Sequence, residues 1–386
     1  MNAHGSAASE PKLPQRSAPR VELTMLTVCT RKHYDDLQCH IRMMDRLNSG
    51  TDWRLVIVDN SDGGISQLKV DHPRVEIRRG LPLDMSKAAD VRFSYHHGSA
   101  LNANLDDIGG RFLLVLDPDL FVVYPNWMRE TIEHVLQREL CFFGVPWHPR
   151  WYMKYRYFPA VHFLLVDLQR VPLARLDFRP QLEERPSWSR RYRAAAVESA
   201  PGTSIRTNYA FSGFLRQAGW RMLNAVYRAG YFVFSRQLIG SSRDTGWKIW
   251  ADFGSCPAEF VLPVVDLDSE FTAPQFLMTK LGRTLEAMFP VQFRFLPKRG
   301  TYFTPAEAAA CGLPNLRSLG VEAFVWREKA FAFHRRGHMR EQLNLPEADR
   351  SETLAWSAML DRYDAPTQCP AGPVGPRSTR NRCAKV

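Results

Sequence analysis

RFLLVLDPD, residues 111–119, joins an apolar run to two carboxylates, and the fold and the chemistry can both be argued outward from it. Five apolar residues in succession, 112–116, are typical of a strand that is buried on both faces of a parallel sheet. Asp117 and Asp119 then stand one residue apart on a turn stiffened by Pro118. Such a pair can hold Mg²⁺ or Mn²⁺, with substrate phosphates as further ligands. Taken alone, the tripeptide fits an Asp turn that closes a strand equally well.

The flanking sequence alternates between strand and helix patterns, which predicts an α/β protein with an open, mixed, mostly parallel sheet flanked by helices. Ligands of such sheets bind at the carboxyl ends of the strands, where Asp59, Asp117 and Asp119 are expected. Apolar periodicity predicts strands over 21–30, 54–59, 75–80, 111–119 and 140–145, and helices over 34–48, 96–105 and 126–138. Further along, the patterns weaken and predict strands over 160–168, 231–240 and 261–268, and helices over 303–316 and 346–361.

Charge is unevenly distributed over the 386 residues, which carry a formal net charge of +11. Residues 1–20 and 365–386 are basic and rich in Pro, Gly, Ala and Ser, so we expect disordered tails. Residues 170–228 hold eleven Arg against four acidic residues. This excess fits a segment that binds an anionic molecule or a membrane surface, or simply a solvated face. No zinc-finger spacing or RNA-binding motif is present, so we expect no nucleic-acid partner.

Cysteine usage and hydropathy predict where the protein works. Its seven cysteines are odd in number and form no CxxC pair, which favours reduced thiols over a zinc ribbon or a disulfide framework. No apolar run is long enough to span a membrane, and the N-terminal residues lack the apolar core of a secretion signal. We therefore expect a cytoplasmic protein with, at most, peripheral membrane contact.

Three sequence elements occur in a characteristic order over about residues 21–145. VELTMLTVCTRKHYDDL leads into RLVIVDNSD, and SYHHGSALNANLDDIGG then leads into RFLLVLDPDLFVVYPNW. This order resembles the nucleotide-sugar half of family-2-type glycosyltransferases with the GT-A fold. The matching positions are the V-D-N-S element 58–61, the G-x-A-x-N element at Gly98, Ala100 and Asn102, and the D-x-D element 117–119.

The resemblance implies roles for individual residues. Asp59 would contact the base or ribose, although a strand-closing Asp is the simpler alternative. The family often has Pro after the first strand, whereas this chain has Cys29-Thr30-Arg31. The implied donor contacts are Thr27, Thr30, Arg31, Asp59, Asn102, Asp117, Arg335 and Arg336. The implied ligands of Mn²⁺ or Mg²⁺ are Asp117, Asp119 and His334, with His338 as the second choice of histidine.

Inverting members of this family use a downstream carboxylate as general base, which removes the acceptor proton. Asp244 in GSSRDTGWKI is the best match, although it could simply cap the helix that follows. Asp252 and Glu259 are its rivals. Trp147 and Trp151 could stack on an acceptor sugar, or could equally pack in the core.

Together these features predict a nucleotide-sugar-binding half (21–145), an acceptor half (146–345) and a C-terminal helix (346–364) between the tails. The activity expected is metal-dependent, inverting transfer of a sugar from a nucleoside-diphosphate sugar to a hydroxyl of a glycan or lipid-linked acceptor. One alternative is a nucleotidyltransferase that makes nucleotide sugars, but the loop Thr27–Lys32 lacks the glycines such enzymes use to hold phosphates. The other is a non-catalytic protein that binds nucleotides or anions.

Overall fold

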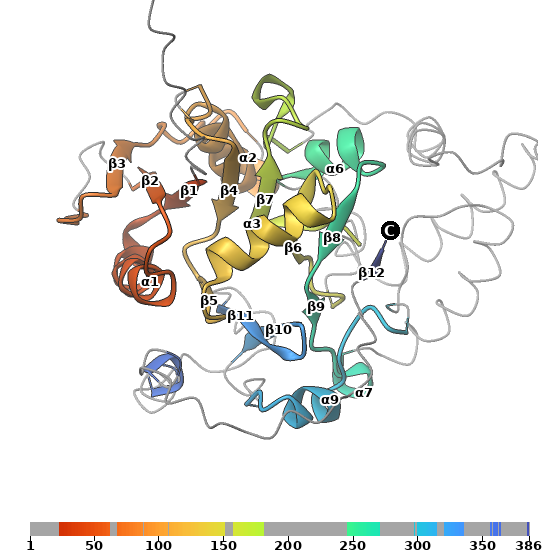
Figure 1. Cartoon of the computed structure of the whole chain (residues 1–386). Coiled ribbons are helices and arrows are strands. Elements are labelled where there is room, and N and C mark those ends of the chain that lie inside the picture. The colour runs from red at the N-terminus through yellow and green to blue at the C-terminus, as the bar shows by residue number, and fades with distance from the viewer. Residues whose placement is uncertain are drawn as a thin grey trace, which may run out of the picture.

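An eight-stranded mixed sheet forms the centre of the molecule, with strand order β12-β8-β6-β7-β4-β1-β2-β3 (Figure 1). The structure is a computed structural model. It describes residues 23–61, 68–87, 89–106, 108–150, 157–180, 245–270, 297, 299–314, 320–335, 356, 358–361, 363 and 384–385. The sheet consists of β1 (Leu23–Cys29), β2 (Trp53–Asp59), β3 (Val75–Arg79), β4 (Phe112–Leu116), β6 (Phe142–Pro146), β7 (Pro159–Asp167), β8 (Ala258–Phe260) and β12 (Ala384–Lys385).

Strand directions make the sheet mostly parallel. β1 lies between β2 and β4 and is parallel to both, β3 continues the parallel set beyond β2, and β6 is parallel to β8. β7 runs against both β4 and β6, and β12 runs against β8. These directions confirm the predicted open, mixed, mostly parallel α/β sheet. They also bring the carboxyl ends of β1, β2 and β4 to one edge.

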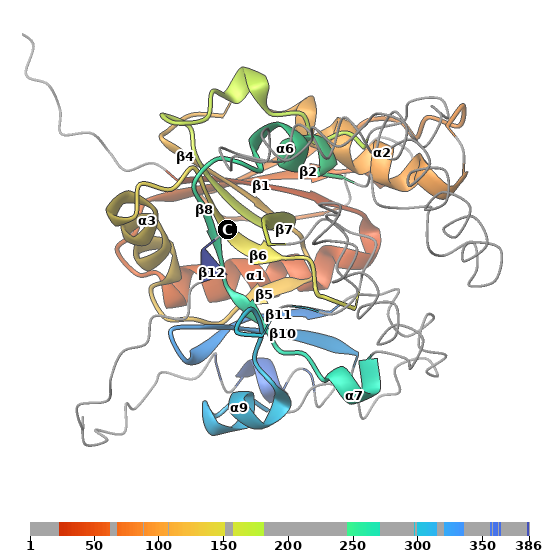
Figure 2. The same cartoon turned by 90° about the vertical axis from the view of Figure 1, so that its right-hand side faces the viewer.

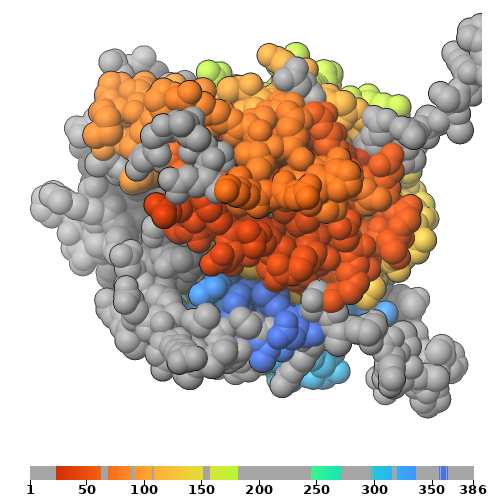
Figure 3. All heavy atoms as spheres, turned by 90° about the vertical axis from the view of Figure 1, so that its left-hand side faces the viewer, coloured from red at the N-terminus to blue at the C-terminus, as the bar shows by residue number. Residues whose placement is uncertain are grey.

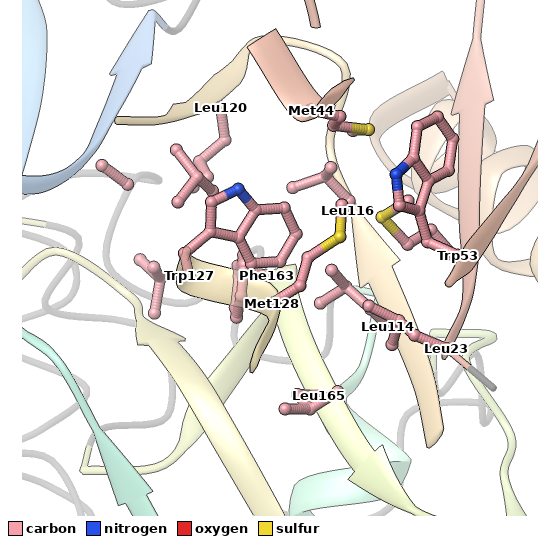
Figure 4. Close-up of a cluster of buried hydrophobic side chains, with 14 of the residues drawn as sticks. Leu23, Met44, Trp53, Leu114, Leu116, Leu120, Trp127, Met128, Phe163 and Leu165 are labelled. Carbon is pink, nitrogen blue, oxygen red and sulfur yellow. The ribbon is translucent and has the colours of Figure 1, made fainter. Parts of the chain in front are cut away.

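Helices cover both faces of the sheet (Figure 2). Successive residues of a strand point to opposite faces, and in the central strands both sets are apolar, so each face needs a cover. One face packs against α1 (Tyr34–Leu47) and α3 (Trp127–Gln137). The opposite face packs against α2 (Ala89–Asn102) and α6 (Trp247–Phe253). Figure 4 shows the first of these cores, in which Trp127 and Met128 of α3 lie beside Phe163 of β7 and Leu116 of β4.

A second sheet of four strands, ordered β5-β11-β10-β9, lies on the side of the large sheet that α1 and α3 cover (Figure 2). It consists of β5 (Leu120–Val122), β9 (Leu262–Pro263), β10 (Val321–Trp326) and β11 (Lys329–Arg335). The sequence patterns predicted neither β10 nor β11. The chain passes from the large sheet to the small one through Asp117-Pro118-Asp119, between β4 and β5. The predicted strand 111–119 is therefore β4 followed by the carboxylate turn, and β5 begins directly after it.

Segments far apart in sequence meet beside the small sheet. Trp356, Met359 and Leu360 pack against Phe121 of β5 and Met43 of α1. The described residues between 356 and 361 are helical, as predicted. In Figure 3 the blue residues of β10, β11 and the segment around Trp356 lie directly against the red residues that include α1.

The other predicted elements agree with the structure to different degrees. α2 begins at Ala89, seven residues before the predicted start at 96. The predicted strand 261–268 is only β9 followed by the short helix α7 (Leu267–Glu270), and the predicted helix 303–316 is α9 (Pro305–Ala310). The described residues also include two single turns of 3₁₀ helix, η1 (Arg31–His33) and η2 (Leu173–Arg175). The predicted strand 231–240 lies outside the described residues. No helix of the described part is both long and apolar enough to cross a membrane.

Candidate metal centre

The Asp117-Pro118-Asp119 turn is held by the backbone of both sheets. The Asp117 N–H donates to the His162 carbonyl of β7 at 2.9 Å, and the Arg335 N–H donates to the Asp119 carbonyl at 2.9 Å. The Leu120 N–H donates to the Asp117 carbonyl at 3.2 Å, which closes the turn. These bonds fix both carboxylates at the carboxyl end of β4, beside the end of β1.

Asp117, Asp119 and His334 lie close enough together to share a metal ion. Each offers one ligand atom, and these atoms lie within 4.8 Å of one another. His334 comes from β11, which pairs with β5 so that His334 is opposite Leu120, and its Nε2 lies 3.1 Å from Asp119 Oδ1. The structure thus brings together the three residues that the resemblance implied as ligands.

The donor set fits a divalent ion. Asp117 Oδ1 is a buried carboxylate oxygen that has no hydrogen-bond partner among the described residues. Leaving such an oxygen buried and unpaired is costly, and a cation would compensate it. Two carboxylates and one imidazole suit Mn²⁺ or Mg²⁺, which keep the remaining positions for water or phosphate.

Two histidines that the sequence analysis did not single out also lie beside Asp117. His162 Nδ1 is 3.4 Å from Asp117 Oδ2, and His97 Nε2 is 4.0 Å from Asp117 Oδ1. Burial alone would raise the pKa of Asp117, but the hydrogen bond and charge of His162, together with His97, lower it below its ordinary value. For Asp119, burial is likewise opposed by His334, and the pKa is lowered. Both carboxylates are therefore kept ionised, the form that a metal requires.

A further group of charged residues adjoins this centre at the start of α1. Asp36 lies 4.0 Å from a guanidinium nitrogen of Arg335. Burial raises the pKa of Asp36 to about 6, although Arg335 acts in the opposite direction. Burial also lowers the pKa of His33, partly offset by the charge of Asp119. Arg335, an implied donor contact, thus lies beside the candidate ligands.

The ends of β1 and β2 hold most of the other implied donor contacts. Asp59 accepts hydrogen bonds from the Tyr34 hydroxyl at 2.6 Å and from the Ser61 N–H and hydroxyl at 3.0 and 2.6 Å. This is the geometry of a strand-closing Asp, and it also fixes the carboxylate at the edge of the sheet. Thr27 Oγ1 is buried without a hydrogen-bond partner in the described structure. Thr30 and Arg31 follow at the turn into η1, where Arg31 is exposed.

Asn102 has structural partners instead. Its side-chain amide donates to Asp177 Oδ1 at 2.9 Å, and its side-chain carbonyl accepts from the Phe178 N–H at 2.8 Å. Gly98 of the same element packs closely on this segment, since a Cβ there would come within 2.6 Å of the Phe178 carbonyl oxygen. The G-x-A-x-N element therefore anchors residues 177–179 to α2, and the donor contact predicted for Asn102 stays a prediction.

Four of the predicted residues lie outside the described part of the chain: the acceptor-side Asp244 and Trp151, the donor contact Arg336, and His338. Trp147 is only 7% exposed, and its ring meets His162 edge-on at 4.2 Å, as expected for the packing alternative. Of the rival bases, Glu259 is buried and paired with His134 and Arg138, whereas Asp252 is exposed on α6.

Comparisons with known proteins return partial structural similarities. No family model and no curated protein matches the sequence. Among solved structures, the galactosyltransferase LgtC with donor and acceptor sugar analogues is 13% identical, covers 39% of this chain and 61% of its own, and has a TM-score of 0.29. The mannosyltransferase PcManGT from Pyrobaculum calidifontis, in complex with GDP-Man and Mn²⁺, is 12% identical. The match covers 42% of this chain and 50% of that one, with a TM-score of 0.27. S. aureus TarS 1–349 with UDP-GlcNAc is 14% identical. The match covers 33% of this chain and 36% of that one, with a TM-score of 0.23. The chain thus spans less than two thirds of each.

Proposed function

We propose that the protein is a metal-dependent glycosyltransferase that moves a sugar from a nucleoside-diphosphate sugar to a hydroxyl acceptor. The observation that carries the proposal is the convergence of Asp117, Asp119 and His334 at the carboxyl end of the parallel strands. The ordered V-D-N-S, G-x-A-x-N and D-x-D elements support it as a resemblance to family-2-type enzymes.

In this proposal, Asp117, Asp119 and His334 hold Mn²⁺ or Mg²⁺ at the diphosphate of the donor. An ion held by these three residues would supply positive charge to offset the charge on the departing diphosphate. Asp59 and Thr27, at the neighbouring strand ends, position the nucleoside. Arg31 and Arg335 supply positive charge for the phosphates, as guanidinium groups commonly do.

Transfer with inversion requires a carboxylate that removes the acceptor proton as the hydroxyl attacks the anomeric carbon. We assign this role to Asp244 on the sequence resemblance. The inverting course is tested by proton NMR of the newly formed glycosidic linkage, which should show the anomer opposite to that of the donor. A product with the donor's anomeric configuration would contradict the inverting course while leaving the donor and metal assignments intact.

The donor site can be tested directly. UDP-, GDP-, dTDP- and CMP-linked sugars are each incubated with the protein in Mn²⁺, Mg²⁺ or EDTA, and nucleotide release is measured. We expect release from one nucleotide class only, with loss in EDTA. Asp119→Asn should lower the rate by about 100-fold or more, because the metal supplies several kcal/mol of stabilisation. Asp268→Asn, an exposed change on α7, serves as the matched control.

Three results would contradict the proposal. Full activity of Asp119→Asn would remove the metal role. Release of pyrophosphate from nucleoside triphosphates would favour the nucleotidyltransferase alternative. Binding of a nucleotide that is indifferent to metal, without any sugar release, would favour a non-catalytic binding protein.

A further inference from the structure

Strand pairing in the small sheet places three functional positions side by side. β10 pairs with β11 so that Glu322 lies directly opposite His334. β11 in turn pairs with β5 so that His334 lies opposite Leu120, next to Asp119. Because side chains of directly paired residues point to the same face, the register places Glu322 and His334 side by side, and the start of β5 brings Asp119 next to His334.

The two ring nitrogens of His334 face two different carboxylates. Nε2 lies 3.1 Å from Asp119 Oδ1, and Nδ1 lies 3.5 Å from Glu322 Oε2. A neutral imidazole carries a proton on one nitrogen and a lone pair on the other. A ring nitrogen that binds a metal must present its lone pair, so if Nε2 is the ligand the proton lies on Nδ1, which faces Glu322.

We propose that Glu322 is a positioning residue of the metal centre, which orients the His334 ring and selects the tautomer in which Nε2 can bind the ion. This inference rests on the proposed metal site and names a residue that the sequence resemblance did not point to. Histidines that bind metals commonly donate their second ring N–H to a carboxylate in this way, and that partner raises the basicity of the ligand.

Glu322 is suited to this role by its own surroundings. Its side chain is completely buried, so it has little freedom to leave His334. Arg150 Nε lies 3.9 Å from Glu322, and the same guanidinium donates to Glu270 Oε1 at 2.6 Å. Arg150 therefore offsets the negative charge of two buried carboxylates, which would otherwise be costly to keep in the interior.

The chain also contains a matched pair that does not adjoin the candidate ligands. Glu259 of β8 is buried, lies 3.0 Å from His134 Nε2 and pairs with Arg138 at 2.8 Å. Glu322 and Glu259 are thus both buried glutamates held by a histidine and an arginine. Changes to the two residues should have similar costs for the fold, while only Glu322 should affect metal binding.

The inference is tested by the affinity of the full chain for Mn²⁺ alone, measured by electron paramagnetic resonance titration. We expect Glu322→Gln to weaken binding about 10- to 100-fold, the usual effect of losing such a partner. Glu259→Gln should leave the affinity unchanged, and Asp119→Asn should abolish binding. Wild-type affinity in Glu322→Gln, with binding still dependent on Asp119, would overturn this inference alone. If the wild type bound no Mn²⁺, the proposed metal site would fall with it.

A second measurement needs no variant of Glu322. In the Mg²⁺-loaded wild-type protein, long-range proton–nitrogen correlation spectra report which ring nitrogen of each histidine carries the proton. The His334 signals can be assigned by their absence in His334→Gln. We expect the Nδ1–H tautomer, and the Nε2–H tautomer would overturn the inference even if Glu322→Gln failed to fold.

Discussion

At the scale of single residues, burial and neighbours decide which titratable groups can act. Asp117 and Asp119 are kept ionised by neighbouring histidines despite burial, so they are ready to bind a cation. Asp59 is a more deeply buried carboxylate, and its oxygens already accept hydrogen bonds from Tyr34 and Ser61. The same residue type at two strand ends of one sheet edge therefore suits two uses, an ion in one case and a fixed polar contact in the other.

His40 provides a pH-dependent test of residue burial. Burial lowers its pKa to about 4, from 6.5 in an unfolded chain, and its ring packs edge-on against Phe121 at 4.3 Å. Between pH 4 and pH 6.5, His40 is protonated in the unfolded chain but neutral in the folded protein. The free energy of unfolding is therefore highest above pH 6.5 and decreases as the pH falls toward 4. The loss amounts to about 3 kcal/mol, at roughly 1.4 kcal/mol per pKa unit.

Replacing His40 by Leu removes this proton. In denaturant titrations with EDTA, the free energy of unfolding of the variant should therefore fall less than that of the wild type between pH 7.5 and pH 4.5. Parallel pH profiles for the two proteins would show that His40 does not remain neutral in the folded state.

At the scale of elements, α2 illustrates how a sequence motif can be recognised and its role still depend on packing. Gly98, Ala100 and Asn102 were identified as part of an ordered set. In the structure they lie where α2 meets residues 177–179, with Ala100 fully buried and Asn102 bonded to Asp177 and Phe178. Sequence reveals the element, but the segment that it holds lies 75 residues away and emerges only from the fold.

Gly98→Ala tests this close packing. The added methyl group would lie 2.6 Å from the Phe178 carbonyl oxygen and 2.8 Å from Arg179 Cα, and backbone atoms cannot move aside cheaply. Overpacking of this kind costs about 1–3 kcal/mol, so the midpoint of chemical denaturation should fall. Gly109→Ala is the matched control, because a Cβ there would meet nothing within 4 Å. Equal stability of the two variants would contradict the packing role of Gly98.

Two strands of the small sheet, β10 and β11, could not be predicted. β10 is buried at five of its six positions and β11 at four of its seven, and neither shows the alternation of buried and exposed residues that marks a half-exposed hairpin. His334 was identified from a family resemblance, without its strand. Glu322 had no local signal at all, because its importance follows from its register with His334.

At the scale of the whole molecule, the candidate centre lies where the two sheets meet. Asp119 and His334 are 215 residues apart in sequence and in contact in the fold. Asp59, Asp117 and Asp119 could be placed at one edge from the sequence, because parallel strands bring their carboxyl ends together. His97 and His162 could not, since the contacts that bring them to Asp117 depend on how α2 and β7 pack around β4.

We propose that Asp117, Asp119 and His334 hold a divalent ion at which a nucleoside diphosphate binds. Calorimetric titration of UDP, GDP, dTDP and CMP, with and without Mn²⁺, is the decisive measurement. We expect one nucleoside diphosphate to bind the wild type only when Mn²⁺ is present, and Asp119→Asn to abolish this binding. Nucleotide binding of equal strength without Mn²⁺, or binding retained in Asp119→Asn, would contradict it.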